Sequence, residues 1–263
     1  MALHREFAAL SAPARQRPAA SRRIRLPLAD GRATTVHVAT YDLATTELRV
    51  AVMGAQQRLE PWCESTGVQE AVVGGFFVRP HGLPLGEVRT AGVLRRHVPF
   101  AQPWGSVRAC VHVEGGEPVI AGRRDLPAAP RGDLLQAGPL LVRHGRPWFD
   151  ADADAEGFSA ASHEFDSDIT EGRHPRAALG LADGRALAVV CDGRARTEAG
   201  LSLDELARLM TALGCHTALN LDGGGSATLI SGGRLRNRPR GGFERVERGG
   251  RPVSTALVFL PRG

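Results

Sequence analysis

The chain has 263 residues, of which 43% are hydrophobic and 23% charged, with a formal net charge of +5. This composition is typical of a globular protein that is long enough to bury a core without disulfide or metal staples. It excludes a wholly disordered chain and a small disulfide scaffold. The 32 glycines and 17 prolines favour strands and loops over long helices.

The cysteines and the apolar runs indicate which metal sites, membrane segments and cellular location to expect. Cys63, Cys110, Cys191 and Cys215 stand at long, irregular intervals without a C-x-x-C pair, so the sequence carries no zinc motif. Free buried thiols are the simpler interpretation, and two disulfides are the alternative. No apolar run reaches the length of about 18 residues that a membrane span needs. The N-terminus has no continuous apolar segment of a signal peptide, so we expect a cytoplasmic protein.

The first third of the chain predicts a short arm followed by strands. Residues 1–22 are rich in Ala, Arg and Pro without a period, which predicts a flexible arm before one domain over 23–263. The β-rich runs 34–40 and 47–53 predict two strands that can pair with each other. The apolar run 70–77 contains a Gly-Gly pair, which indicates a bulge or a close approach of the backbone to another segment.

Two hairpins are predicted further along. The runs 107–113 and 118–121 flank a Glu-Gly-Gly turn, and the runs 177–181 and 186–191 flank Asp183-Gly184, a strong hairpin signal.

Between these hairpins, residues 140–142 predict a short strand, and 150–156 form an acidic run. The acidic run lacks the glycine and the final glutamate of a calcium-binding loop, so it predicts a solvated loop.

Residues 202–213 give the clearest helix. Ser202 and Glu205 have the spacing of a capping box, and Leu203, Leu206, Met210 and Leu213 fall on one helical face. The apolar runs 217–221 and 252–260 predict two further strands. Many antiparallel or mixed strands with a few packed helices predict a single α+β domain.

The densest chemical signal is the segment from Asn220 to Thr228, which contains Asp222, three consecutive glycines and Ser226. A strand end presents a carboxylate, and glycines allow successive N–H groups to point into one concavity that binds an anion. A tight turn capped by Asp222 is the alternative.

Two polar blocks precede this segment. The block His174-Pro175-Arg176 opens an apolar strand, where a buried arginine needs a partner. The block Asp192-Gly193-Arg194 follows the next strand, with Glu198 close behind. Taken singly, each of these charges is better explained as part of a solvated loop.

Together these blocks resemble the phosphodiester glycosidase family over about residues 23–259. The motifs that carry the resemblance are, in chain order, Gly74-Gly75-Phe76-Phe77, Ala137–Leu141, His174–Gly180, Asp192-Gly193-Arg194, Gly200–Leu203, Asn220–Thr228 and Arg251–Ser254. The resemblance implies hydrolysis of the sugar C1–O bond of a sugar-1-phosphodiester, such as a GlcNAc-1-phosphodiester, small or polymeric. Nothing in these motifs requires a metal or another cofactor. Val73 stands where the family usually has Asn.

The resemblance and the chemistry of a departing phosphate suggest residue roles. Asp222 is expected to be the nucleophile or water-activating base and Arg176 the bidentate phosphate clamp. Glu198 and Asp192 are candidates for the second carboxyl role. The expected substrate contacts are Gly75, Phe76, His174, Arg194, Gly223, Gly224, Gly225, Ser226, Thr228 and Arg251. We expect seven of these residues to converge on one cleft: Gly75, Phe76, His174, Arg176, Asp192, Asp222 and Ser226.

Two other functions are weighed against this one. A non-catalytic module that binds a phosphoglycan or envelope polymer is suggested by Val73. Nucleic-acid binding is suggested by the seven arginines in 234–251, but Glu244 and Glu247 are interspersed among them, which favours a solvated loop. We therefore expect a sugar-phosphodiester partner and no nucleic acid.

Overall fold

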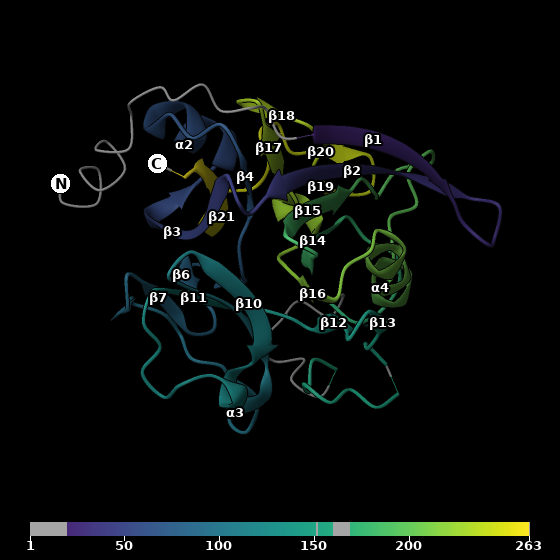
Figure 1. Ribbon diagram of the computed structural model, residues 1–263. Helices are drawn as coiled ribbons and strands as arrows, with labels where there is room; N and C mark the ends of the chain where they lie inside the picture. The colour runs from purple at the N-terminus through teal and green to yellow at the C-terminus, as the bar shows by residue number, and fades with distance from the viewer. Residues whose placement is uncertain (1–19, 151, 160–168, 263) are drawn as a thin grey trace.

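The computed structural model describes residues 20–150, 152–159 and 169–262 (Figure 1). Its strands form three larger antiparallel sheets and two short two-stranded ones. Most of the expected N-terminal arm lies outside the described residues, and the first strand begins inside it, at Ala20.

The largest sheet has seven strands and contains the predicted hairpin around Asp183-Gly184. Residue pairs from Arg176–Cys191 to Ala182–Arg185 join its two strands, which confirms that hairpin. The sheet consists, in spatial order, of β1 (Ala20–Pro27), β2 (Ala33–Asp42), β15 (Arg185–Cys191), β14 (Arg176–Ala182), β16 (Thr217–Asn220), β12 (Leu140–Arg143) and β13 (Arg146–Pro147).

Two five-stranded sheets complete the main framework. The first holds the other predicted hairpin and consists of β10 (Glu117–Gly122), β9 (Ala109–Glu114), β11 (Asp133–Gln136), β7 (Val88–Thr90) and β8 (Val93–Leu94). The second consists of β18 (Arg234–Leu235), β17 (Leu229–Ser231), β4 (Ala71–Val73), β21 (Val253–Pro261) and β3 (Thr46–Gln57).

The remaining elements are short. The two-stranded sheets pair β5 (Phe77–Val78) with β6 (Leu83–Pro84) and β19 (Arg240–Gly242) with β20 (Arg245–Val246). The helices are α2 (Leu59–Thr66), α3 (Trp104–Val107) and α4 (Leu203–Ala212), with 3₁₀ turns η1 (Arg123–Asp125) and η2 (Gly224–Ser226). Strands therefore dominate, and the expected α+β class is confirmed only in its coarse form of one β-rich domain. Within the described ranges, no helix is long and apolar enough to cross a bilayer.

The expected pairing of the strands near 34–40 and 47–53 is wrong. β2 pairs with β1 and β15, whereas β3 pairs with β21, so the chain passes from one sheet to another at Leu43–Thr45. The central residues of β2 are buried on both faces. A strand of this kind is stabilised by strands on both sides and by layers above and below, which a simple hairpin does not supply.

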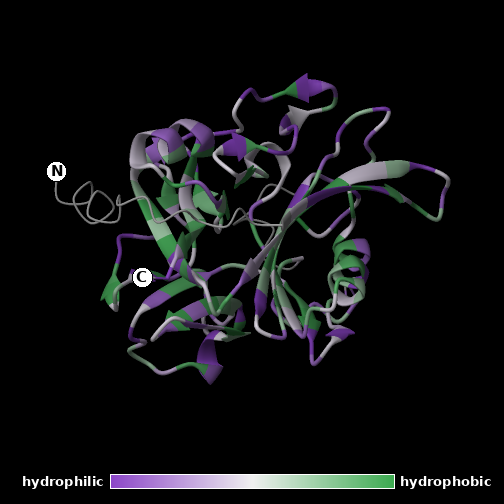
Figure 2. Ribbon diagram, turned by 45° about the horizontal axis from the view of Figure 1, so that its top comes forward, coloured by the Kyte–Doolittle hydropathy of each residue, from purple (hydrophilic) through white to green (hydrophobic). Residues whose placement is uncertain are grey.

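One core joins all three large sheets. It contains Leu179 from β14, Val111 from β9 and Leu257 from β21, all buried. Tyr41 on β2 stacks on Phe259 of β21, with ring centroids 3.7 Å apart. Figure 2 shows hydrophobic residues concentrated in the strands near the centre of the molecule.

The second core lies between the seven-stranded sheet and α4, which packs on one face of it (Figure 1). The Ser202 side chain accepts a hydrogen bond from the N–H of Glu205, and the Glu205 carboxylate accepts one from the N–H of Ser202. Leu203, Leu206 and Met210 are buried in this core, so the predicted helix and its apolar face are confirmed.

The acidic run 150–156 was expected to be a solvated loop, but part of it is buried. Glu156 turns inward, and its carboxylate accepts hydrogen bonds from the N–H groups of Ala109 (3.0 Å) and Leu140 (2.7 Å). Burial raises its pKa to about 7. The run thus joins the starts of β9 and β12. All four cysteines are free and buried, as expected.

Candidate active site

Asp222 stands at the end of β16, where the triple-glycine turn begins. Its N–H donates to the carbonyl oxygen of Gly74 at 3.0 Å, and its Oδ1 accepts from the N–H of Gly223 at 2.9 Å. The Gly-Gly pair after β4 and the triple-glycine turn, distant in sequence, therefore meet at this carboxylate.

The carboxylate of Asp222 is half-buried, and its surroundings change its acidity. Burial is the largest influence and raises the pKa to about 6, whereas the Ser226 hydroxyl, the Arg251 charge, the Gly223 N–H and the Arg79 charge lower it. Such a group is mainly ionised at neutral pH and titrates just below it, which suits a nucleophile or general base.

Close contacts explain why this turn is made of glycine. A β-carbon added at Gly223 would lie 2.8 Å from the carbonyl oxygen of Pro175. At Gly224 it would lie 3.1 Å from Arg194 Nη1, and at Gly225 3.3 Å from Arg251 Nη2. Two guanidinium groups thus lie against the backbone of the turn.

The expected anion-binding array of three glycine N–H groups is only partly available. The N–H of Gly223 donates to Asp222, and that of Gly224 donates to the carbonyl oxygen of Pro175. Within the described ranges, the N–H of Gly225 makes no hydrogen bond. The Ser226 hydroxyl is buried and acts on the Asp222 carboxylate, whose pKa it lowers.

His174 and Arg194 meet beside the turn. Arg194 Nη2 lies 3.4 Å from His174 Nδ1, and His174 Nε2 lies 3.0 Å from the carbonyl oxygen of Glu171. These partners fit a neutral imidazole that accepts at Nδ1 and donates at Nε2. Arg194 Nη1 also donates to the carbonyl oxygen of Gly241 at 3.0 Å.

The Arg176 side chain has a different environment from the one expected of a phosphate clamp. It is 4% exposed, and its nitrogens donate to the carbonyl oxygens of Leu201 (3.2 Å), Ile169 (2.8 Å) and Gly172 (3.3 Å). Its guanidinium thus holds two backbone segments together, the loop before β14 and the residues that lead into α4.

The other two candidate carboxylates also have structural partners. Asp192 lies 3.2 Å from His37 Nε2 and accepts from the N–H of Arg238 at 2.7 Å. Glu198 accepts from the N–H of Thr35 at 2.6 Å and forms an ion pair with Arg25 at 2.8 Å. Both carboxylates thus fix loops against β2.

Of the other residues that were expected to contact the substrate, some lie at the turn and one lies in the core. Gly75 donates its N–H to Thr255 Oγ1 at 3.0 Å, and Thr228 Oγ1 donates to the carbonyl oxygen of Ser226 at 3.0 Å. Phe76 is buried among Phe100 and Phe158 rather than exposed to a ligand.

Position 73 lies close to the candidate site but faces away from it. Val73 is fully buried in the main core, where it pairs with Ala256. The side chain that departs from the family pattern therefore contributes to packing in this protein.

Sequence reasoning missed Arg79, whose charge acts on Asp222. Its position two residues after the Gly-Gly-Phe-Phe block was the available signal. Among the described residues, no group of three or more His, Cys, Asp or Glu side chains converges as a metal site requires.

Of the arginines in 234–251, Arg240 is buried and donates to the carbonyl oxygen of Gly193 at 3.2 Å. Arg236 donates to the carbonyl oxygen of Ser231 at 2.8 Å. Part of this arginine-rich segment therefore serves the fold.

Comparisons with solved structures support the fold. The chain is similar to the catalytic domain of zebrafish N-acetylglucosamine-1-phosphodiester α-N-acetylglucosaminidase, described as auto-inhibited by its pro-peptide, with a TM-score of 0.72 and 19% identity over 95% of this chain and 85% of that one. It is also similar to a hypothetical protein from Synechocystis, with a TM-score of 0.63 and 21% identity over 91% of this chain and 61% of that one.

Sequence comparison identifies the family. The chain is 35% identical over 193 residues to the SPbeta prophage-derived protein YomE of Bacillus subtilis, which covers 70% of this chain and 27% of that protein. The match thus spans about a quarter of that relative's length. The phosphodiester glycosidase model matches residues 66–260, which include Asp222 and every glycine of its turn. The chain belongs to the phosphodiester glycosidase family.

Proposed function

We propose that the protein hydrolyses the C1–O bond of a sugar-1-phosphodiester, with Asp222 as the nucleophile or water-activating base. The observation that carries the proposal is the environment of Asp222, a carboxylate with a pKa of about 6 beside the charges of Arg251 and Arg79. Family membership supports the reaction class.

The chemistry follows from where charge develops. When the C1–O bond breaks, its electron pair stays on the phosphate, which leaves as a phosphomonoester, and water supplies the hydroxyl group to C1. In the base role, Asp222 accepts the proton of that water. In the nucleophile role, it forms a glycosyl ester that water then hydrolyses. The site must above all stabilise the departing phosphate, because this group gains negative charge as the bond breaks.

We assign the phosphate contact to Arg251 and Arg194 rather than to Arg176. Within the described ranges, the Arg251 guanidinium makes no hydrogen bond or ion pair, although it lies next to Gly225. Arg194 lies against Gly224. The N–H of Gly225 adds a donor of the kind that binds phosphate oxygens.

A product analysis tests the proposal. The protein is incubated with methyl and p-nitrophenyl GlcNAc-1-phosphodiesters, and both products are measured. The reaction is run in ¹⁸O-labelled water. C1–O cleavage gives free sugar and an unlabelled phosphomonoester, cleavage of the P–O bond next to the sugar gives the same products with the label in the phosphomonoester, and cleavage of the other P–O bond gives sugar-1-phosphate and an alcohol. Label in the phosphomonoester or release of sugar-1-phosphate would contradict the proposed bond.

A matched pair of variants then tests the role of Asp222. Asp222→Asn keeps the shape and removes the charge, so turnover should fall on the order of 10⁴-fold while ligand binding stays near normal. Asp204→Asn, at an exposed position on α4, is the control and should keep full turnover. Binding of the phosphodiester without turnover in the unaltered protein would instead support a non-catalytic binding module.

A further inference from the structure

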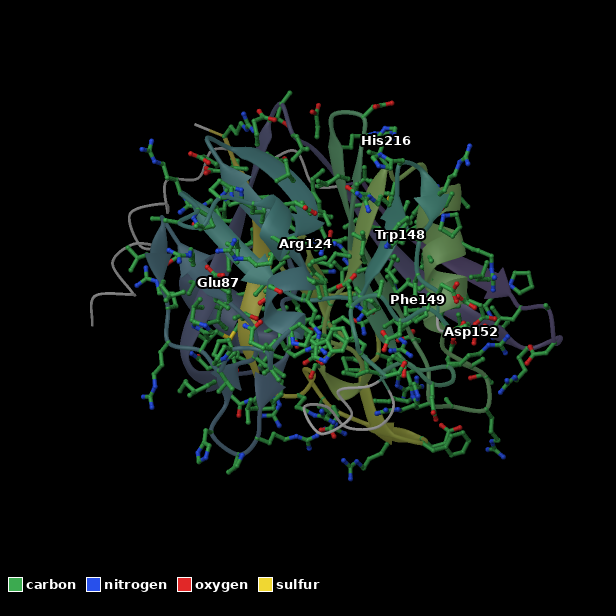
Figure 3. The ribbon with its side chains drawn as sticks, turned by 90° about the horizontal axis from the view of Figure 1, so that it is seen from below. Glu87, Arg124, Trp148, Phe149, Asp152 and His216 are labelled. Carbon is green, nitrogen blue, oxygen red and sulfur yellow. The ribbon has the colours of Figure 1, made fainter. Side chains whose placement is uncertain are left out.

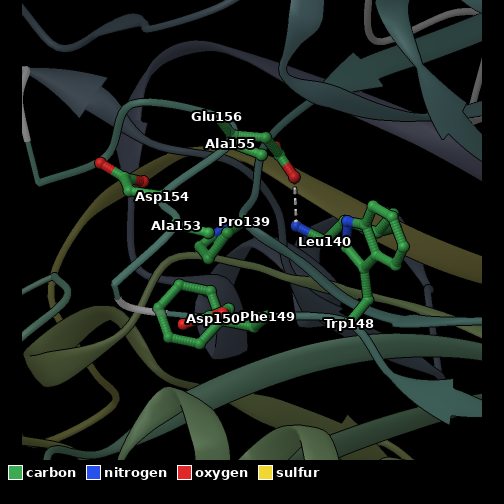
Figure 4. Close-up of a pocket in the computed structure, with 9 residues that line it drawn as sticks. All are labelled: Pro139, Leu140, Trp148, Phe149, Asp150, Ala153, Asp154, Ala155 and Glu156. Carbon is green, nitrogen blue, oxygen red and sulfur yellow. Dashed lines mark hydrogen bonds between the residues drawn. The ribbon is translucent and has the colours of Figure 1, made fainter.

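We infer that a cavity beside β12 is a second subsite that binds one neutral sugar ring of a longer glycan, an inference that rests on the proposed function. The cavity has a volume of about 240 Å³ and lies between the start of β12, the residues after β13 and the loop 153–156 (Figure 4). This volume is below the roughly 300–1,000 Å³ of sites for drug-sized ligands, so it limits the occupant to about one ring.

The walls offer an aromatic surface. Trp148 lines the cavity and is 47% exposed, an unusual degree of exposure for so large an apolar side chain. The Arg143 guanidinium lies 4.8 Å from the centroid of its ring and helps to fix it. Phe149 also lines the cavity and lies on the same side of the molecule (Figure 3). The partly negative faces of such rings attract the C–H groups of a sugar's apolar face.

The rim of the cavity is acidic. Asp150, Asp154 and Glu156 line it, and their carboxylates accept hydrogen bonds from backbone N–H groups. A carboxylate accepts more than one hydrogen bond, and among the described residues Oδ2 of Asp150 has no partner. These oxygens can accept hydrogen bonds from sugar hydroxyls. The negative charges of Asp150 and Asp154 oppose a phosphate, so the expected ring is neutral and lies apart from the phosphodiester.

The cavity adjoins the strand that carries the candidate catalytic residue. Gly138 donates its N–H to the carbonyl oxygen of Asn220, and Asn220 donates its N–H to that of Pro139, both at 3.0 Å. Pro139 lines the cavity, and Asn220 precedes Asp222 by two residues. The starts of β12 and of the triple-glycine turn are therefore neighbours in the sheet.

Direct binding to the full chain tests the subsite without requiring turnover. The probes are the neutral disaccharide chitobiose, p-nitrophenol and inorganic phosphate, followed by saturation-transfer NMR and calorimetry. We expect chitobiose to bind, and Trp148→Ala to weaken it at least tenfold, while Trp148→Phe, which keeps an aromatic face, retains most of the binding. Leu94→Ala is the control, because Leu94 is 50% exposed on a different sheet and should leave binding unchanged.

The outcomes separate this inference from the proposed function. Chitobiose should bind Asp222→Asn as it binds the unaltered protein, because the subsite does not need that charge. Absence of chitobiose binding, binding of p-nitrophenol or phosphate alone, or equal binding by the Trp148→Ala and Leu94→Ala variants would overturn the subsite. Failure of the proposed function would instead appear as sugar-phosphodiester turnover that survives Asp222→Asn, whatever chitobiose does.

Discussion

Arg176 Nη1 lies 2.8 Å from the carbonyl oxygen of Ile169, and the same guanidinium also reaches the carbonyl oxygens of Leu201 and Gly172. A buried cation that is surrounded by backbone carbonyls needs those bonds, because an unpaired buried charge is costly. Arg176 thus positions the loop before β14, including His174, relative to the segment that leads into α4.

Replacement of Arg176 should therefore mainly reduce the stability of the folded protein. An ammonium cannot reach three carbonyls that a planar guanidinium contacts, so Arg176→Lys should lower the free energy of unfolding by about 1.5–3 kcal/mol. Urea denaturation followed by circular dichroism measures this. The control is Arg196→Lys, where the side chain is 87% exposed and the change should have little effect. A fully stable Arg176→Lys protein that has lost turnover would restore Arg176 as a phosphate ligand.

Gly200 and Gly214 form a second matched pair. Both have left-handed backbone conformations, with φ of +79° and +85°. A β-carbon at Gly200 would lie 2.6 Å from the backbone of His174, whereas one at Gly214 would meet no atom within 4 Å. Gly214→Ala should cost about 1–2 kcal/mol, from backbone strain alone. Gly200→Ala should cost more than about 3 kcal/mol.

Thermal and urea unfolding of the two glycine variants check this order. Equal losses of stability would mean that the His174 segment moves aside freely. That result would also weaken the view that the contact between His174 and Gly200 holds the candidate site in place.

Glu156 should make stability depend on pH. Its pKa is raised from 4.5 to about 7 by burial, so the folded protein holds this proton more tightly than the unfolded chain does. The resulting contribution to stability is fully present below pH 4.5 and is lost as the pH rises through 7. Glu156→Gln has no such proton, so its stability relative to the unaltered protein should improve between pH 5 and pH 8. Urea midpoints at the two pH values measure this difference, and a constant difference would contradict the raised pKa.

Local signals in the sequence predicted the elements that local chemistry determines. The capping box of Ser202 and Glu205 fixed the start of α4, and Asp183-Gly184 fixed the hairpin of β14 and β15. The partners of β2 and β3 were not predictable in this way. Their separation depends on contacts with β15 and β21, which lie more than a hundred residues away in the chain.

In the candidate site, too, local sequence predicted some features, whereas others depend on contacts between distant segments. The glycine triplet located Asp222 because close backbone contacts demand glycine whatever the rest of the fold does. The roles of Arg176 and Glu198 could not be predicted, because a charged residue next to an apolar strand looks the same whether it faces a ligand or a backbone group. Only the fold reveals that Glu198 accepts from Thr35 and pairs with Arg25.

The last prediction concerns how Arg251 controls the acidity of Asp222. The proposed role requires the ionised carboxylate, so kcat/KM should fall with decreasing pH around a pKa of about 6. The positive charge of Arg251 lowers that pKa. Arg251→Gln removes this charge, so the acid limb of the profile should move to higher pH. The plateau should also fall roughly 10²–10³-fold, because a donor to the developing phosphate charge is lost.

The pH dependence of kcat/KM in the two proteins separates the effects. Arg248→Gln, an exposed position in the same segment, is the control and should leave both the limb and the plateau unchanged. If Arg251→Gln lowers the plateau but leaves the limb in place, the titrating group is not Asp222 and Arg251 acts on the substrate alone. If the limb moves while the plateau is kept, Arg251 tunes Asp222 without contacting the phosphate. The assignment of both roles to Arg251 therefore requires the two changes to occur together, because one guanidinium beside Gly225 would act on the carboxylate and on the leaving group at once.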